Sequence, residues 1–125
     1  MIVGVGTDIV GIARVARIVE GPRGEAFLRR VLTEEERRLL GRWAEGSPRR
    51  AEFAAGRWAA KEAAAKALGC GIGRELGFGD IEILPDGRGR PVCRVAREIA
   101  AGVRLHVSIA HADGWACAFA VAERP

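Results

Sequence analysis

Two carboxylates and a lysine have the types and spacing to bind a cation beside a phosphate. Glu62 and Lys66 are four residues apart in an alanine-rich stretch that predicts a helix, so their side chains share one face. Asp8 follows residues 2–5, which predict a short strand. Taken alone, a surface ion pair and a helix N-cap are the simpler interpretations of these residues. If the fold brings Asp8 beside Glu62, the two carboxylates can bind Mg²⁺, which takes its other ligands from phosphates and water.

The basic residues add two hints of a phosphate ligand. Of the 20 lysines and arginines, only Lys61 and Lys66 are lysines, and both lie in this predicted helix. Lysine presents a compact point charge to a phosphate, whereas arginine presents a rigid fork. The net charge of +4 arises between Arg14 and Arg50, where ten arginines accompany six glutamates. This excess predicts an acidic partner or a phosphate-rich ligand, with an ordinary solvated surface as the alternative.

Two other motifs carry weaker signals. Gly69, Gly71 and Gly73 follow the predicted helix instead of linking a strand to a helix, so they are not a dinucleotide-binding fingerprint. They predict either a helix C-cap with a turn or a loop whose backbone approaches a ligand. Ser108 has a histidine two residues before it and another three residues after it. No nucleophile-elbow motif is present, so we interpret this serine as structural and not hydrolytic.

Composition excludes several classes of protein. The 125 residues fit one domain, and the hydrophobic fraction of 49% is typical of a folded chain. The three cysteines are widely separated and fit neither a disulfide framework nor a zinc site. No apolar stretch is long enough to span a bilayer, and the N-terminus lacks the features of a signal peptide. We therefore expect a protein of the reducing cytoplasm.

The first half of the chain predicts the helices that must position these groups. Thr33 and Glu36 form a capping-box motif, which predicts the start of a helix that stops at Gly46-Ser47-Pro48. Gly69 closes the longest, alanine-rich helix. The predicted helical segments are residues 9–19, 27–32, 33–43 and 51–68.

The second half predicts strands. The Asp113-Gly114 pair is typical of a tight hairpin turn between the last two of them. The predicted strands are residues 80–84, 91–95, 105–110 and 115–121, and residues 97–103 predict a further helix. Together these segments predict a single α+β domain over residues 1–125, with helices packed on a mostly antiparallel sheet.

In their order and spacing, these motifs resemble the holo-acyl-carrier-protein synthases, the short bacterial type within the 4′-phosphopantetheinyl transferase superfamily. The most characteristic block is Gly56 to Ala67, where an aromatic residue and two small residues precede Lys-Glu-Ala and a second lysine. Trp58 stands where the family commonly has phenylalanine, and Cys70 replaces a usual threonine. The further matching blocks are residues 4–10, residues 27–33 with Glu36, residues 71–73 and residues 106–111.

The resemblance implies the 4′-phosphopantetheinyl transferase fold and an enzyme of fatty acid biosynthesis. Such an enzyme moves 4′-phosphopantetheine from coenzyme A to a serine of an acidic acyl carrier protein and releases 3′,5′-ADP. Asp8, Glu62 and Lys66 match the family's catalytic residues, and Asp8 and Glu62 match the ligands of its Mg²⁺ cofactor. For the general base, a metal-bound water and Glu62 acting through water are both open. The family assembles as homotrimers with active sites between neighbouring subunits.

Two larger residue sets follow from the same resemblance. The residues that match coenzyme A contacts are Arg49, Arg50, Arg57, Lys66, Gly69, Gly71, Gly73, Pro91 and His106. The residues that match the basic surface for the carrier protein are Arg14, Arg17, Arg23, Phe27, Arg29 and Arg30. Residues 21–26 differ from the family in length and charge, and Glu25 places an acid inside this basic surface.

Three alternatives accompany the transferase hypothesis. The same transfer could serve carrier domains of secondary metabolism, although those enzymes are usually about twice as long. A non-catalytic protein could dock carriers only, but Asp8, Glu62 and Lys66 are all present. A basic nucleic-acid-binding module is the third alternative. The charge excess is small, tyrosine is absent and no nucleic-acid motif occurs, so we expect no nucleic-acid partner and no membrane partner.

Overall fold

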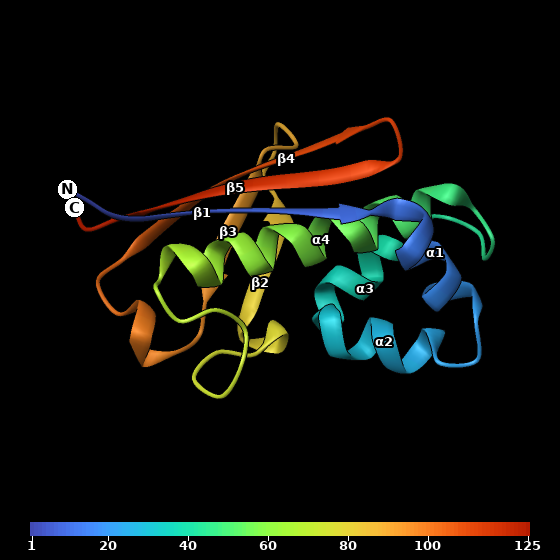
Figure 1. The fold of residues 1–125 in the computed structure, drawn as a ribbon, viewed down its shortest axis with the longest axis horizontal. Helices are drawn as coiled ribbons and strands as arrows, with labels where there is room; N and C mark the ends of the chain where they lie inside the picture. Colours follow the sequence, from blue (N-terminus) through green and yellow to red (C-terminus); the bar gives the residue numbers. More distant parts are fainter.

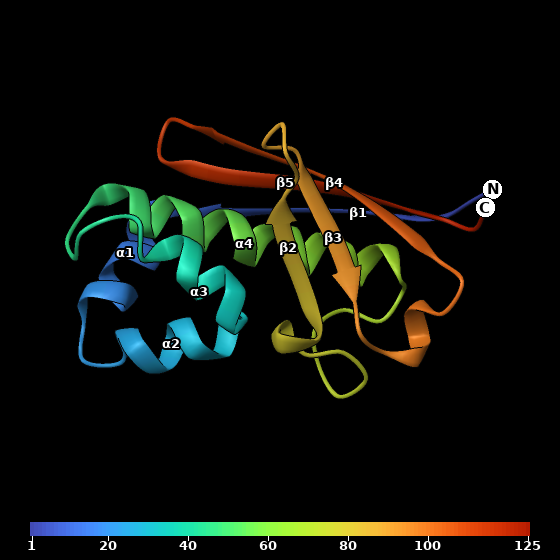
Figure 2. The same cartoon turned by 180° about the vertical axis from the view of Figure 1, so that it is seen from behind.

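One long helix lies between two antiparallel sheets in the computed structural model, which describes residues 1–125 (Figures 1 and 2). Helix α4 (Pro48–Ala67) packs on a three-stranded sheet, and a two-stranded hairpin passes on its other side. The other elements, in chain order, are β1 (Ile2–Gly11), α1 (Ile12–Glu20), α2 (Gly24–Val31), α3 (Glu34–Leu40), η1 (Phe78–Asp80), β2 (Ile81–Pro85), β3 (Pro91–Val95), η2 (Glu98–Ala100), β4 (Arg104–Ala112) and β5 (Trp115–Glu123). The predicted α+β class with antiparallel strands is confirmed.

The three-stranded sheet joins the start of the chain to its end. Its strand order is β1-β5-β4, and both pairs are antiparallel, with Gly6 and Val107 on either side of Ala120. Strands β4 and β5 are connected by the predicted tight turn, in which Asp113 and Gly114 have φ angles of 51° and 80°. Strand β1 therefore pairs only with the last strand, and Figure 1 shows both termini at one corner of the sheet.

The two faces of this sheet carry side chains of very different size. On the face toward α4, strand β5 presents buried alanines, and strand β1 presents Gly4 and Gly6. Small residues on this face allow the helix to lie close to the strands. The outer face carries large apolar side chains that are about half exposed, namely Val3, Val5, Ile9, Trp115 and Phe119.

The core is a cluster of 24 buried residues drawn from α4, both sheets and the three shorter helices. Helices α1, α2 and α3 gather at the N-terminal end of α4 (Figure 1). Helix α3 begins at the predicted capping box: Thr33 Oγ1 accepts from the Glu36 N–H at 3.3 Å, and Glu36 Oε1 accepts from the Thr33 N–H at 2.8 Å. None of the helices combines the length and hydropathy needed to span a membrane.

Two helix starts differ from the sequence predictions. The helix predicted from Ile9 begins only at Ile12, because the preceding residues pair with β5 along nearly all of β1. Helix α4 begins at Pro48, which the sequence predicted as the end of the preceding helix. Ser47 is the N-cap of α4, and its Oγ accepts a hydrogen bond from the Arg49 N–H. Proline suits the first helical turn because it lacks the N–H that would have no partner there.

Two predicted helices are shorter in the structure. Helix α3 ends at Leu40 instead of Trp43, and the carbonyl oxygens of both residues accept hydrogen bonds from the Arg50 side chain. These bonds satisfy carbonyl groups that a helix would otherwise have paired within itself. Residues 97–103 form only the short turn η2, followed by Gly102 with a φ angle of 71°. A left-handed residue at this position is incompatible with a continuous helix.

Candidate active site

The contact between β1 and α4 brings three of the predicted catalytic residues to one place. A Cβ at Gly4 would lie 1.8 Å from the Ala67 carbonyl oxygen, and a Cβ at Gly6 would lie 2.0 Å from that of Ala63. The strand therefore runs against the helix in the opposite direction. Asp8, two residues farther on the same face of β1, comes level with the helical turn that carries Glu62.

Lys66 connects the end of the strand to the helix. Its Nζ donates a hydrogen bond to the Thr7 carbonyl oxygen at 3.0 Å and lies 3.3 Å from Asp8 Oδ1. The lysine side chain is half exposed and the Asp8 side chain about one-fifth exposed, so the pair faces solvent at one side. Lys66 lies one helical turn beyond Glu62, on the same face of α4. The Thr7 carbonyl is a site atom that sequence patterns could not reveal.

The electrostatics of the site favour a bound cation. Partial burial raises the pKa of Glu62, the negative charge of Asp8 raises it further, and the positive charge of Lys66 opposes both effects. Partial burial and mutual repulsion disfavour the ionised forms of two neighbouring carboxylates, and a divalent cation bound to both would stabilise those forms. Their oxygen donors suit Mg²⁺, which needs only one or two protein carboxylates. No group of three or more histidine, cysteine or acidic side chains that could hold a metal ion occurs in the chain, so this site offers two protein carboxylates only.

Lys61 does not belong to this group, although the sequence drew attention to it. Its side chain is completely buried and pairs with Glu36, Nζ to Oε1, at 2.6 Å. Lys61 therefore cannot contact a phosphate ligand at the surface, and of the two lysines only Lys66 is available to one. Burial lowers the pKa of Lys61, and the neighbouring carboxylate of Glu36 opposes that shift. The composition did not separate the two lysines, whereas the family resemblance pointed to Lys66.

The residues that match coenzyme A contacts are spread over the chain. Gly69 and Gly71, with φ angles of 85° and 67°, lie just after the C-terminal end of α4, whereas Arg49 and Arg50 lie at its N-terminal end. A helix of 20 residues spans about 30 Å. One copy of the chain therefore does not gather these residues around a single nucleotide.

The remaining residues of that set lie in α4, in the loop after it and in strands β3 and β4. Arg57 donates from Nε to the Ile83 carbonyl oxygen at 3.0 Å, and its guanidinium lies over the Phe53 ring. Burial lowers the pKa of Arg57, and the charge of Glu36 opposes this effect. Pro91 begins β3, and Gly73 lies in the loop after α4. His106 lies on the outer face of β4, where its Nε2 is 2.9 Å from Glu123 Oε1.

The predicted carrier surface is exposed and reaches the helix that carries Glu62. The rings of Phe27 and Trp58 are 5.2 Å apart, and the Arg14 guanidinium lies over Trp58 at 5.7 Å. Trp58 precedes Glu62 by one helical turn. Arg29 forms an exposed ion pair with Glu25 at 3.3 Å, so part of its charge is neutralised within the chain. All five arginines of this set are exposed, namely Arg14, Arg17, Arg23, Arg29 and Arg30.

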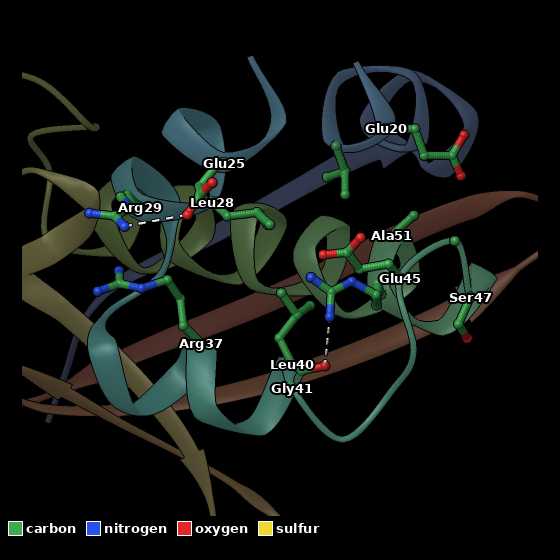
Figure 3. Close-up of a pocket in the computed structure, with 13 residues that line it drawn as sticks. Glu20, Glu25, Leu28, Arg29, Arg37, Leu40, Gly41, Glu45, Ser47 and Ala51 are labelled. Atoms are coloured by element: carbon green, nitrogen blue, oxygen red, sulfur yellow. Dashed lines mark hydrogen bonds and ion pairs between the residues drawn. The ribbon is translucent and has the colours of Figure 1, made fainter. Parts of the chain in front are cut away.

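A cavity of about 510 Å³ lies among the ends of the short helices and the start of α4 (Figure 3). Leu28, Leu40 and Ala51 give it an apolar part, and its lining also includes Arg29 and Arg50. It includes none of the three residues Asp8, Glu62 and Lys66. Those residues therefore do not form the wall of this cavity.

The structure gives no support to a serine nucleophile. His106 is hydrogen-bonded to Glu123, and His111 Nε2 lies 3.0 Å from the Glu52 carbonyl oxygen. Ser108 makes no side-chain hydrogen bond to either histidine. The interpretation of Ser108 as a non-catalytic residue agrees with this geometry.

Comparisons with known proteins show the family to which the chain belongs. A family model described as the 4′-phosphopantetheinyl transferase superfamily matches residues 4–120, and the chain belongs to this family. Within it, the chain is 47% identical over 124 residues to a holo-[acyl-carrier-protein] synthase of Geobacillus kaustophilus (strain HTA426), covering 99% of this chain and 91% of that protein. The resemblance predicted from the sequence motifs is confirmed.

Solved structures agree over the whole chain. A holo-(acyl-carrier-protein) synthase from Bacillus anthracis str. Ames, in complex with CoA (3′,5′-ADP), has a TM-score of 0.86 and 39% identity, covering 100% of this chain and 99% of that one. The Helicobacter pylori holo-[acyl-carrier-protein] synthase, in complex with coenzyme A, has a TM-score of 0.83 and 34% identity, covering 95% and 99%. Both structures therefore share this arrangement of helices and strands.

Proposed function

We propose that this chain transfers the 4′-phosphopantetheine group of coenzyme A to a serine of an apo-acyl carrier protein and releases 3′,5′-ADP. The observation that carries the proposal is the meeting of Asp8, Glu62 and Lys66 across the β1–α4 contact. The chain matches holo-acyl-carrier-protein synthases over 99% of its length, which favours an acyl carrier protein as the acceptor. The expected setting is fatty acid biosynthesis in the cytoplasm.

The transfer forms one bond and breaks another at a single phosphorus atom. The serine oxygen of the carrier bonds to the β-phosphorus of coenzyme A, and the bond from that phosphorus to the 3′,5′-ADP oxygen breaks. Phosphoryl transfer depends chiefly on alignment and on neutralising charge. The ammonium of Lys66 lies at the surface beside Asp8, where it can neutralise negative charge on the leaving phosphate. The serine proton must leave as the new bond forms.

Asp8 and Glu62 would hold Mg²⁺ through their carboxylate oxygens. When bound, the ion neutralises charge on the pyrophosphate of coenzyme A. Asp8 makes its ion pair through Oδ1, and Oδ2 makes no hydrogen bond within the chain. The two carboxylates come from different elements, so the closeness of β1 to α4 sets their separation. The other metal ligands would be water and phosphate oxygens.

A homotrimer would complete the site. The residues that match coenzyme A contacts lie at both ends of α4 and on the outer sheet face, which a second copy could bring together. Large apolar side chains that are about half exposed, such as Val5 and Phe119, support contact between copies through this face. His106 lies on the same face and would then approach the nucleotide of a neighbouring subunit.

The carrier protein would dock on the arginines of α1 and α2. Acyl carrier proteins are acidic, and complementary charge speeds encounter and fixes orientation. The contact of Phe27 with Trp58 extends this surface to α4, one turn before Glu62. A serine presented at this end of the surface would therefore be near the carboxylates.

Mass spectrometry of the carrier protein tests the proposal. An apo-acyl carrier protein incubated with this protein, coenzyme A and Mg²⁺ should gain the mass of phosphopantetheine. Addition of EDTA should prevent the gain, and excess Mg²⁺ should restore it. Asp8→Ala and Glu62→Ala should each abolish the gain without loss of the fold, whereas Glu98→Ala in the exposed turn η2 should not. Normal turnover by either of the first two variants would refute the assignment of the metal ligands.

A further inference from the structure

Lys61 and Glu36 form a fully buried ion pair at the meeting point of several elements. The Lys61 ammonium donates to Glu36 Oε1 at 2.6 Å, to the Val31 carbonyl oxygen at 2.7 Å and to the Phe78 carbonyl oxygen at 3.0 Å. These three acceptors use all three of its N–H donors, which only the charged form possesses. The lysine is therefore fixed in position by α2, α3 and η1 at once.

The carboxylate oxygens of Glu36 also accept hydrogen bonds from two backbone N–H groups. Its Oε1 also accepts from the Thr33 N–H at 2.8 Å, and its Oε2 accepts from the Ile83 N–H of β2 at 2.8 Å. No buried side-chain nitrogen or oxygen in the chain lacks a partner. Buried ion pairs are weak contributors to stability, because desolvation offsets their attraction, and fixing a single register is their best-attested use.

Helix α4 gains from such a fixed point because small residues line the surface that it buries against the sheet, although Phe53 and Trp58 also hold the helix through their ring contacts with α2, η1 and Trp43. Methyl groups resemble one another after a small rotation or translation of a helix, so they specify its position less sharply than large interlocking side chains do. The alanines of α4 that are buried below 5% exposure are Ala54, Ala55, Ala59, Ala60, Ala63, Ala64, Ala65 and Ala67. The contacts of Gly4 and Gly6 set how closely β1 approaches α4.

We infer that the Lys61–Glu36 ion pair positions Glu62, by fixing the rotation and translation of α4 against β1. Lys61 directly precedes Glu62, and neighbouring side chains on a helix point about 100° apart. A rotation of α4 that moved Lys61 away from its three acceptors would also turn Glu62 away from Asp8. Lys61 is accordingly a positioning residue, and it acts on the site without contacting substrate. The consequence for Mg²⁺ rests on the proposed function, whereas the positioning of α4 does not.

The test compares Lys61→Met with a matched control, Leu40→Ala. Leu40 is buried in α3 at 3% exposure, and it makes none of the side-chain contacts of the ion pair. The first measurement uses the metal-free protein and follows the backbone amide NMR signals of Gly4 and Gly6. These two residues of β1 pack against the backbone of α4. Lys61→Met should shift or broaden both signals, and Leu40→Ala should leave them unchanged.

The second measurement is direct binding of Mn²⁺, a spectroscopic probe for the Mg²⁺ site, followed by electron paramagnetic resonance. Lys61→Met should weaken binding about tenfold or more, as expected when a residue that supports a metal ligand is lost. Leu40→Ala should retain wild-type affinity at the same fraction of folded protein. If Lys61→Met does not fold, Glu36→Gln weakens the same pair at nearly constant size and should change both measurements in the same direction.

The outcomes separate the two ideas. If the wild-type protein binds no Mn²⁺, the metal site of the proposed function fails, while the glycine signals still decide the positioning role. If Lys61→Met and Leu40→Ala give the same glycine signals, the positioning role of the ion pair is wrong, whatever the metal does.

Discussion

Gly6 of β1 lies directly on the backbone of Ala63 in α4, so that a Cβ at Gly6 would come within 2.0 Å of the Ala63 carbonyl oxygen. Only glycine permits this approach. Asp8 lies two residues farther on the same face, and its position relative to Glu62 therefore depends on a contact made by residues without chemical function. The spacing of strand and helix is a condition for the site.

Gly6→Ala should separate β1 from α4. The added methyl group overlaps a backbone atom that cannot rotate away, so we expect a loss of about 3 kcal/mol in the free energy of unfolding, together with reduced transfer. Gly11→Ala is the control in the same strand, because its nearest neighbour atom, in Trp115, is 3.8 Å away. Urea unfolding measures both variants. Equal stability of the two would contradict the close contact.

Thr33→Ala should loosen the start of α3. The hydroxyl accepts from the Glu36 N–H and donates to Glu82 Oε2 at 2.6 Å, so its loss affects both the capping box and the link to β2. Loss of an N-cap side chain lowers stability by about 1 kcal/mol. Thr33→Ser keeps the hydroxyl and should unfold close to the wild type. Thermal unfolding monitored by circular dichroism distinguishes the variants, and a serine variant as weak as the alanine variant would argue against a capping role.

Metal affinity should decrease on acidification at a higher pH than for an ordinary glutamate site. Partial burial and the charge of Asp8 raise the pKa of Glu62, and only its ionised form binds a cation. Protons therefore compete with the metal as the pH falls through this raised pKa. A Mn²⁺ binding series over pH measures the effect. Affinity that stays constant down to the usual pKa of glutamate would show that Glu62 is not a ligand.

Asp8→Asn should lower the pKa of Glu62 in the metal-free protein. The substitution removes the negative charge beside the carboxyl group but not its partial burial, so the pKa should fall without returning fully to the usual value. Carbon-13 NMR of the Glu62 carboxyl group follows this titration. An unchanged pKa in the variant would mean that the two carboxylates are not neighbours.

Phe119→Glu should disrupt contact between copies of the chain. Phe119 lies on the outer sheet face and is 49% exposed, so a charge there should leave the single-chain fold intact and oppose burial against another copy. Analytical ultracentrifugation should show a trimer for the wild type and a monomer for the variant. Arg88→Glu, in the exposed turn between β2 and β3, is the control and should remain trimeric. A trimeric Phe119→Glu variant would place the interface elsewhere.

Local patterns predicted the elements whose signals lie within a few residues. The Thr33 capping box, the Asp113-Gly114 turn and the left-handed glycine Gly69 that follows the C-cap of α4 are all present in the structure. The sequence did not predict that β1 would continue through Asp8 to Gly11, because pairing with a strand more than 100 residues away decides that boundary. Asp8 is consequently a strand residue and not the N-cap suggested by its local context.

In the candidate site, too, local sequence patterns predicted some features, whereas others depend on contacts between distant residues. The four-residue spacing of Glu62 and Lys66 predicted their shared face, and the family resemblance supplied Asp8. Nothing local distinguished Lys61 from Lys66, because their difference depends on Glu36, which lies 25 residues away and is buried beside Lys61. The scatter over one chain of the residues that match coenzyme A contacts likewise depends on tertiary structure, which residue spacing does not contain.

The sorting of side chains by size in β5 also has a consequence for folding. Alanines at alternate positions fill the narrow space beneath α4, while Trp115, Cys117 and Phe119 point outward. If the register of this strand shifted by one residue, its two aromatic side chains would point toward α4. The space between the strand and the helix there accommodates only methyl groups. A shifted register of β5 is therefore excluded by steric overlap with α4. This overlap favours a single strand register when the helix packs on the sheet.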